Sequence, residues 1–122
     1  MIDKAARALP LLLADILQAA RDVAAYVQEV ERADFLVDRM RQRAVIQCFE
    51  VIGEAPKKLP MAYRQQHPEV PWRFMAAFRD KLIHDYFEVD LALVWTTARR
   101  EIPALLPRLE SLPGLTEPKT DA

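Results

Sequence analysis

The residues with the clearest chemical potential lie within eight positions of one run, FRDKLIHDYFEVD. They are an arginine, an aspartate, a histidine and a tyrosine, namely Arg79, Asp80, His84 and Tyr86. A neutral imidazole can take a proton from a ribose 2′-hydroxyl or deliver one to a leaving oxygen. A guanidinium binds phosphate through its planar fork and stabilises charge on the phosphate oxygens. This set of residue types suits cleavage of an RNA phosphodiester bond without a metal ion.

Helical geometry separates the four side chains into two pairs. Successive residues rotate by about 100°, so Asp80 and His84 share one face, while Arg79 and Tyr86 share another. Arg79 and His84 would diverge by about 140° in a regular helix, so they converge on one phosphate only if the helix ends near His84 or a second chain supplies the complement. This spacing points towards a dimeric site, in which Asp80 could hold the ring of His84 and two copies of His84 could divide the acid and base roles.

Spacing alone also permits a purely structural interpretation. An arginine and a histidine on one helix are more often a surface ion-pair set or a capped helix end than a catalytic pair. A tyrosine such as Tyr86 is commonly an aromatic at the edge of the core with an exposed hydroxyl. His67 precedes Pro68 in a loop, and two histidines without a carboxylate cluster do not make a metal site. We therefore predict no metal and no cofactor.

Composition predicts one all-α domain. The chain has 122 residues, of which 52% are apolar, so it can bury a core as a single domain. It has only two glycines and no Asn-Gly or Asp-Gly turn between alternating apolar runs. We expect residues 1–110 to form the helical domain and residues 111–122, which hold two prolines and a glycine, to form a flexible tail.

Charge and cysteine content restrict the setting. The 17 basic and 18 acidic residues leave a formal net charge of -1, so any RNA contact must come from a local patch. Cys48 is the single cysteine, which excludes an intramolecular disulfide and a cysteine-rich zinc site and favours a reduced, cytoplasmic setting. The N-terminal run ALPLLLADILQAA is interrupted by Asp15, and no segment has the length of a membrane span.

Four helices are needed to position the polar residues. Apolar periodicity predicts helices over residues 10–30, 34–59, 72 to 84 or 86, and 90–109, with a loop over residues 60–71. The expected N-caps are Asp34 for the second helix and Asp90 for the fourth, and Pro71 would open the third. The inward apolar positions are Leu9, Leu13, Ile16, Ala20, Val23, Val27 and Val30; then Val37, Met40, Ala44, Cys48, Ile52, Ala55 and Leu59; then Trp72, Met75, Leu82 and Tyr86; and finally Leu91, Val94, Ala98, Ile102, Leu105 and Leu109.

Glycine and proline positions add further expectations. A glycine inside a helix lowers helix stability by roughly 1 kcal/mol relative to alanine. The presence of Gly53 within a predicted helix therefore suggests that another backbone packs closely there. Pro56 should kink or stop its helix, and Pro103 and Pro107 should bend or shorten the last one. We also expect Glu54 either to pair with a basic residue of the site or to lie on the polar face.

The motif and its surroundings resemble a known family. Arg79, His84 and Tyr86 match the R-x4-H-x-Y motif of the HEPN superfamily, and the chain is similar to its HepT-like toxins over about residues 10 to 110. The similarity also includes the runs IGEA, HPEVPW, RDKLIHDYFEVD, and VW followed by IPAL. The resemblance implies an up-and-down bundle of four to five helices that dimerises through the motif helices.

The resemblance also implies an activity and partners. It indicates a metal-independent endoribonuclease toxin of a toxin–antitoxin pair, with Arg79 and His84 catalytic and Asp80 where the superfamily often has asparagine. Ionised aspartate cannot donate a hydrogen bond, so its role must differ in detail. The partner implied is an MNT-type nucleotidyltransferase antitoxin, which would transfer AMP to Tyr86 and so block RNA from reaching His84.

The remaining basic residues and the alternatives complete the expectations. Lys81 and Arg73 are the first candidates for contacts with RNA phosphates. A competing interpretation is a non-catalytic HEPN subunit that dimerises or presents a substrate to the nucleotidyltransferase, since fold alone does not decide function. A nucleotide-binding sensor has less support, because the sequence has no glycine-rich phosphate loop.

Overall fold

The computed structural model describes residues 4–84 and 88–115, with side chains described from residue 9 onwards, and every regular element within these ranges is helical. The sequence-based prediction of an all-α bundle is therefore confirmed. The elements are α1 (Lys4–Val27), α2 (Arg32–Phe35), α3 (Arg39–Lys58), α4 (Met61–Gln66), α5 (Trp72–His84), α6 (Leu91–Thr96), a π-helical turn η1 (Thr97–Glu101) and α7 (Ile102–Glu110).

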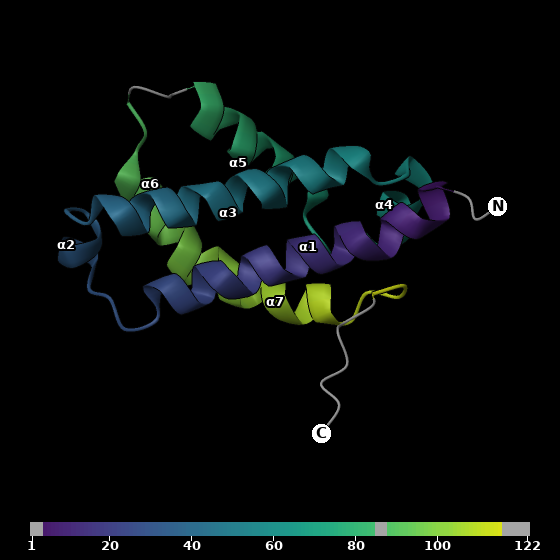
Figure 1. Ribbon diagram of the computed structural model, residues 1–122, viewed down its shortest axis with the longest axis horizontal. Coiled ribbons are helices and arrows are strands. Elements are labelled where there is room, and N and C mark those ends of the chain that lie inside the picture. The colour runs from purple at the N-terminus through teal and green to yellow at the C-terminus, as the bar shows by residue number, and fades with distance from the viewer. Residues whose placement is uncertain (1–3, 85–87, 116–122) are drawn as a thin grey trace.

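The long helices run up and down along the molecule. Figure 1 shows α1 and α3 side by side, and α5 lies against the far side of α3. The helical rod formed by α6, η1 and α7 returns behind them, where α7 and η1 pack on α1. Because α3 is central, its two sides contact α1 and α5 and thereby fix the position of the motif helix.

The core confirms most of the predicted apolar stripes. The first and last helices bury the expected positions, with Leu9, Val30 and Leu91 only partly buried. In α5 the side chains of Trp72, Met75 and Leu82 are buried as predicted, while Tyr86 lies outside the described residues. The fully or nearly fully buried members of the confirmed stripes are Leu13, Ile16, Ala20, Val23, Val27, Val94, Ala98, Ile102, Leu105 and Leu109.

The start of the second predicted helix was wrong. Asp34 lies inside the short α2, and the N-cap of α3 is instead Asp38, whose side chain accepts a hydrogen bond of 3.1 Å from the backbone N–H of Arg41. Val37 and Met40, assigned to the core stripe, are 80% and 84% exposed because they precede or begin α3 where no helix covers them. Both aspartates are good capping residues, so local sequence did not distinguish them.

Several boundaries also differ from the predictions. Helix α1 begins six residues before Pro10, because a proline removes only one helical hydrogen bond and need not stop a helix that packs on a bundle. The predicted loop over residues 60–71 contains α4, and Pro71 lies one residue before α5. At the other end, Leu112 is buried and the backbone oxygen of Pro113 accepts a 2.6 Å hydrogen bond from Tyr63, so this part of the predicted tail packs on the bundle.

The prolines act as local modifiers of the helices. Helix α3 ends two residues after Pro56, in agreement with the expected early stop. The π-helical turn η1 comes immediately before the segment that holds Pro103, whose ring would clash with the carbonyl of Arg99 in a regular α-helix. We attribute the π turn to this clash, and the helix then continues through Pro107 to Glu110. Asp90 caps α6 as predicted, accepting a 3.1 Å hydrogen bond from the backbone N–H of Leu93.

Within the ranges that the structure describes, no helix combines the length and apolar character needed to cross a membrane.

Candidate active site on α5

The site is built on the closest approach of α3 and α5, where Arg79 lies over Gly53. A Cβ atom added to Gly53 would overlap the Cβ of Arg79 and lie 2.7 Å from the backbone oxygen of Met75. The prediction that this glycine marks close packing of another backbone is confirmed. The absence of a side chain at Gly53 lets the aliphatic part of Arg79 cross α3 at its surface.

The guanidinium of Arg79 is held by two carboxylates. One terminal nitrogen lies 3.0 Å from Oε2 of Glu54, and the other donates a 3.1 Å hydrogen bond to Oδ1 of Asp80. Glu54 therefore pairs with a basic residue of the site, the first of its two expected roles. The Arg79 side chain is 24% exposed, and its Nε is buried with no hydrogen-bond partner among the described residues. The arginine is thus fixed in direction and remains accessible at its tip.

Asp80 acts on basic residues and not on the histidine. Its Oδ1 accepts a 2.7 Å hydrogen bond from Nζ of Lys57 as well as the one from Arg79. These hydrogen bonds, the one from Lys57 first, lower the pKa of the Asp80 carboxyl, so that it is ionised at neutral pH. No hydrogen bond joins Asp80 to His84 in the described part of the chain, so the pairing expected from their spacing is absent. Asp80 instead links α3 to the motif arginine.

His84 is the last residue of α5 and its side chain is exposed. Because the regular helix extends through His84, this residue and Arg79 point about 140° apart within one chain. The structure therefore brings together Arg79, Asp80 and residues of α3 but leaves the histidine on a different face. Tyr86 lies outside the described residues, and its predicted position stays a prediction.

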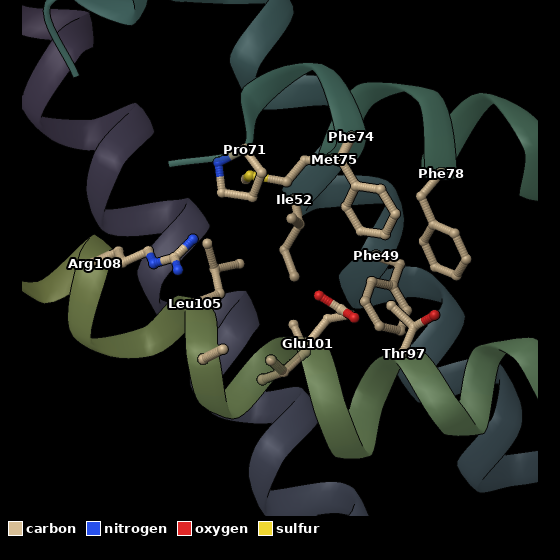
Figure 2. A pocket seen from close by; sticks show the side chains of 12 residues that line it. Phe49, Ile52, Pro71, Phe74, Met75, Phe78, Thr97, Glu101, Leu105 and Arg108 are labelled. Atoms are coloured by element: carbon tan, nitrogen blue, oxygen red, sulfur yellow. The ribbon is translucent and has the colours of Figure 1, made fainter. Parts of the chain in front are cut away.

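The hollows around α5 differ in chemistry. A largely apolar cleft of about 100 Å³ lies between α3, α5 and the η1–α7 segment. Figure 2 shows the rings of Phe49, Phe74 and Phe78 on its wall. Arg79, Asp80 and His84 do not line this cleft, so it is separate from the described part of the candidate active site. Arg79 instead lines a hollow of about 340 Å³ between α1 and α3, whose other charged residues are Asp15, Glu50, Glu54 and Lys58.

Arg73 and Lys81, the two residues predicted to contact RNA, are both exposed on α5. Lys57 is a site residue that the analysis of the motif helix did not assign a role. The available signal was its position four residues after Gly53 on the same helix face, which places it near any side chain that packs over the glycine. Groups of three or more His, Cys, Asp or Glu side chains placed to hold a metal ion do not occur within residues 9–84 and 88–115.

The fold and the motif together match a known protein family. The all-α bundle, with its R-x4-H motif on α5, is matched over residues 16–112 by the family described as Ribonuclease HepT-like. This match covers most of the bundle, including α3 and α5. The chain belongs to the HepT-like ribonuclease family.

Individual relatives agree with this assignment. The chain is 45% identical over 100 residues to "Probable ribonuclease HepT" of Thermococcus cleftensis, which covers 82% of this chain and 91% of the relative. It is 40% identical over 106 residues to "Putative RNase MJ1216" of Methanocaldococcus jannaschii, covering 87% and 88% of the two chains. It is 42% identical over 93 residues to "Putative RNase TTE0752" of Caldanaerobacter subterraneus, covering 76% and 83%. The search of solved structures returned no significant match.

Proposed function

We propose that this HepT-like ribonuclease is the toxin of a toxin–antitoxin pair and cleaves RNA, without a metal ion, at a site formed by two copies of the chain. The observation that carries the proposal is the fixed position of Arg79, packed on Gly53 and oriented by Glu54 and Asp80, with His84 exposed at the end of the same helix. A phosphate-binding arginine together with two imidazoles, one as base and one as acid, can catalyse attack of a ribose 2′-hydroxyl on the neighbouring phosphate.

In the proposed reaction one His84 takes the proton of the ribose 2′-hydroxyl as the 2′-oxygen attacks phosphorus. The bond between phosphorus and the 5′-oxygen breaks, and a second imidazole donates a proton to that oxygen. The products are a 2′,3′-cyclic phosphate and a free 5′-hydroxyl, and the enzyme has gained and lost one proton. Arg79 stabilises the negative charge that builds on the phosphate oxygens.

Glu54 and Asp80 have different roles in this proposal. The Glu54 side chain is 41% exposed, so a phosphate can displace it from Arg79 at modest cost, since exposed ion pairs contribute about 0–1 kcal/mol. Asp80 remains bonded to Lys57 and keeps the guanidinium oriented while phosphate binds. Asp80 is therefore a positioning residue of the site.

A second copy of the chain supplies what one copy lacks. Since Arg79 and His84 diverge by about 140° on one helix, a phosphate bound by Arg79 of one copy is better reached by His84 of the other. Two-fold symmetry also brings two imidazoles to one cleft, as the acid and base roles require. The proposed partners are therefore a second copy, an RNA substrate and the neutralising nucleotidyltransferase.

The alternative function is a non-catalytic subunit that binds or presents a substrate to the nucleotidyltransferase. The two ion pairs of Arg79 favour it to a degree, because they also suit a purely structural link between α3 and α5. The exposure of His84 favours the enzyme, since a structural link does not need an imidazole at the helix end.

The test of the catalytic proposal is RNA cleavage in the presence of EDTA. We expect the wild-type chain to release fragments ending in a cyclic phosphate, and His84→Ala to lower the rate by a factor of about 10² or more. His67→Ala, which changes the other histidine, is the matched control and should retain activity. Undiminished cleavage by the His84→Ala chain would refute the mechanism.

The test of neutralisation concerns Tyr86. We expect an MNT-type nucleotidyltransferase to add AMP to this hydroxyl. The added anion, two residues from His84, would repel RNA and thereby inactivate the enzyme. Tyr86→Phe should cleave RNA yet resist inactivation by the partner and ATP, whereas Tyr26→Phe should be inactivated like the wild type. Mass spectrometry that places AMP on a residue other than Tyr86 would overturn this assignment.

A further inference from the structure

A second groove on α5 lies next to the candidate active site. It has a volume of about 740 Å³ and is bounded by the end of α3, by α4 and by one side of α5. Asp80 forms part of its wall, so the groove is continuous with the cluster that holds Arg79. Figure 1 shows the short α4 at the end of the bundle where α3 leads into α5.

The charges of this groove suit a polyanion. Its ionisable residues are Lys57, Arg64, Arg73 and Asp80, and the one carboxylate among them is already bonded to Lys57. The Nε of Arg64 is buried without a hydrogen-bond partner, and no ion pair or hydrogen bond joins the guanidinium of Arg64 or Arg73 to another described residue. Phosphate oxygens would bind the terminal nitrogens of these two guanidinium groups.

The hollow on the other side of the site has the opposite character. Asp15, Glu50 and Glu54 place three carboxylates around it, against Lys58 and Arg79. A strand of RNA approaching Arg79 from that side would meet net negative charge, which is unfavourable. The charge distribution therefore directs RNA into the groove beside α4.

The axis of α5 leads from this groove to the histidine. Arg73 and His84 are eleven residues apart, so they lie within about 20° of the same face and about 16 Å apart along the helix. Ala77 and Asp80 lie between them on this stripe and both line the groove. Ala77 has a short side chain, and the carboxylate of Asp80 on this stripe is bonded to Lys57 and thus partly neutralised.

We propose that this groove binds the single-stranded RNA that flanks the cleaved bond, with Arg64 and Arg73 bound to its phosphates. The inference rests on the ribonuclease function proposed above and adds the path of the substrate. Two exposed apolar side chains, Met61 at 64% and Phe74 at 47%, also line the groove and offer surface to unstacked bases. Figure 2 shows Phe74 on α5, where it also borders the apolar cleft.

The direct test is the affinity for RNA that cannot be cleaved. We would measure fluorescence anisotropy of a labelled twelve-nucleotide oligouridine with 2′-O-methyl groups, which lacks the nucleophile. Replacing both arginines, Arg64→Gln with Arg73→Gln, should weaken binding by about tenfold or more. It should also reduce the slope of log affinity against log salt by about 1.4, the loss of two phosphate contacts on a single strand.

Controls address folding and position. Arg100→Gln changes an exposed arginine of η1 outside the groove and should bind RNA within twofold of the wild type. Ala77→Glu introduces a carboxylate at an exposed position of the groove floor, so it should weaken binding even if the Arg64 change disturbs folding. If the affinity for RNA and its salt dependence are unchanged in both the double variant and Ala77→Glu, the proposal is overturned.

A cleavage experiment separates this inference from the function on which it rests. The ratio of kcat/KM for a twelve-nucleotide RNA to that for a dinucleotide should fall about tenfold in the double variant, because only the longer RNA reaches the groove. If cleavage depends on His84 but this ratio does not change, the groove is refuted and the function stands. If cleavage does not depend on His84 but the double variant loses RNA affinity, the groove stands and the catalytic assignment fails. Retained RNA affinity with lost binding of the nucleotidyltransferase would assign the groove to a protein and overturn the inference.

Discussion

At the scale of single residues, Gly53 determines where Arg79 can lie. The glycine is 26 positions away in sequence but in direct contact in the fold, and any larger residue would push α5 away from α3. Once the aliphatic part of Arg79 is fixed there, Glu54 and Asp80 orient its tip. Arg79 is thus positioned mainly by packing, and its guanidinium is then oriented by charge.

We predict that Gly53→Ala destabilises the protein and impairs cleavage. The added Cβ overpacks the contact at a cost of about 1–3 kcal/mol, and the gain in helix propensity of about 1 kcal/mol offsets only part of it. Urea unfolding should show a net loss, and the cleavage rate should fall because Arg79 moves. Met40→Ala, at an exposed position of α3 away from the site, is the control and should be active and at least as stable as the wild type. A Gly53→Ala chain with unchanged stability and rate would contradict the importance of this contact.

At the scale of elements, α3 connects the parts of the site. It packs on α1 on one side and on α5 on the other, and it supplies Gly53, Glu54 and Lys57 to the cluster. Its first turn is fixed by the side chain of Asp38, which accepts hydrogen bonds from the backbone and side chain of Arg41. The stability of this turn therefore contributes to the alignment of the helix that carries the partners of Arg79.

We predict that Asp38→Ala lowers the melting temperature at pH 7, whereas Asp34→Ala changes it little. Asp34 lies inside α2 and forms no cap, so it is a matched control of the same residue type. The backbone hydrogen bond from Arg41 lowers the pKa of Asp38 below its ordinary value of 3.8. Its stabilising effect is therefore fully present above pH 3.8 and is lost as pH falls through the lower pKa of the folded state. Thermal unfolding should show the difference between Asp38→Ala and wild type disappearing at low pH; a difference that persists there would contradict the cap.

At the scale of the whole molecule, one exposed apolar surface adjoins the histidine. Ile83 is 42% exposed and lines a surface hollow of about 740 Å³, whose other residues are the apolar Ile46, Leu82 and Val89 and the polar Arg43, Gln47 and Glu50. Apolar surface beside polar site residues is typical of an interface. A second copy seated there would cover Ile83 and bring its own α5 close to His84, which is the arrangement that the proposed site requires.

We predict that Ile83→Glu weakens self-association and cleavage together. The introduced carboxylate would lose its hydration in the proposed interface, and this cost can exceed the gain from pairing with the exposed Arg43 of the same hollow. Sedimentation should show a shift towards monomer, and specific activity should fall more steeply on dilution than in the wild type. Val37→Glu changes another exposed apolar residue, at 80% exposure, and should leave both unchanged. A fully active monomer would rule out the shared cleft.

The sequence by itself determined the helical class, most of the core stripes and the chemistry of the motif. These features depend on local periodicity and residue type, so Leu13 to Val27 in α1 and Val94 to Leu109 in the last rod were predicted well. Local signals were insufficient where two residues could perform one task. Asp34 and Asp38 are equally good caps, and only the packing of α2 and α3 decides between them.

Only the tertiary structure decided how the motif residues are connected. Spacing along one helix predicted that Asp80 pairs with His84. In the structure the Asp80 carboxylate instead accepts a hydrogen bond from Lys57, which lies 23 residues earlier on α3. Likewise, Arg64 joins Arg73 in one groove because α4 folds beside α5, in a stretch that sequence alone indicated to be a loop. Contacts between separate helices depend on which faces pack together, and a single sequence encodes that choice only through the whole core. The chemistry available to the candidate site therefore depends on its residue types, while its geometry depends on the packing of α3 against α5.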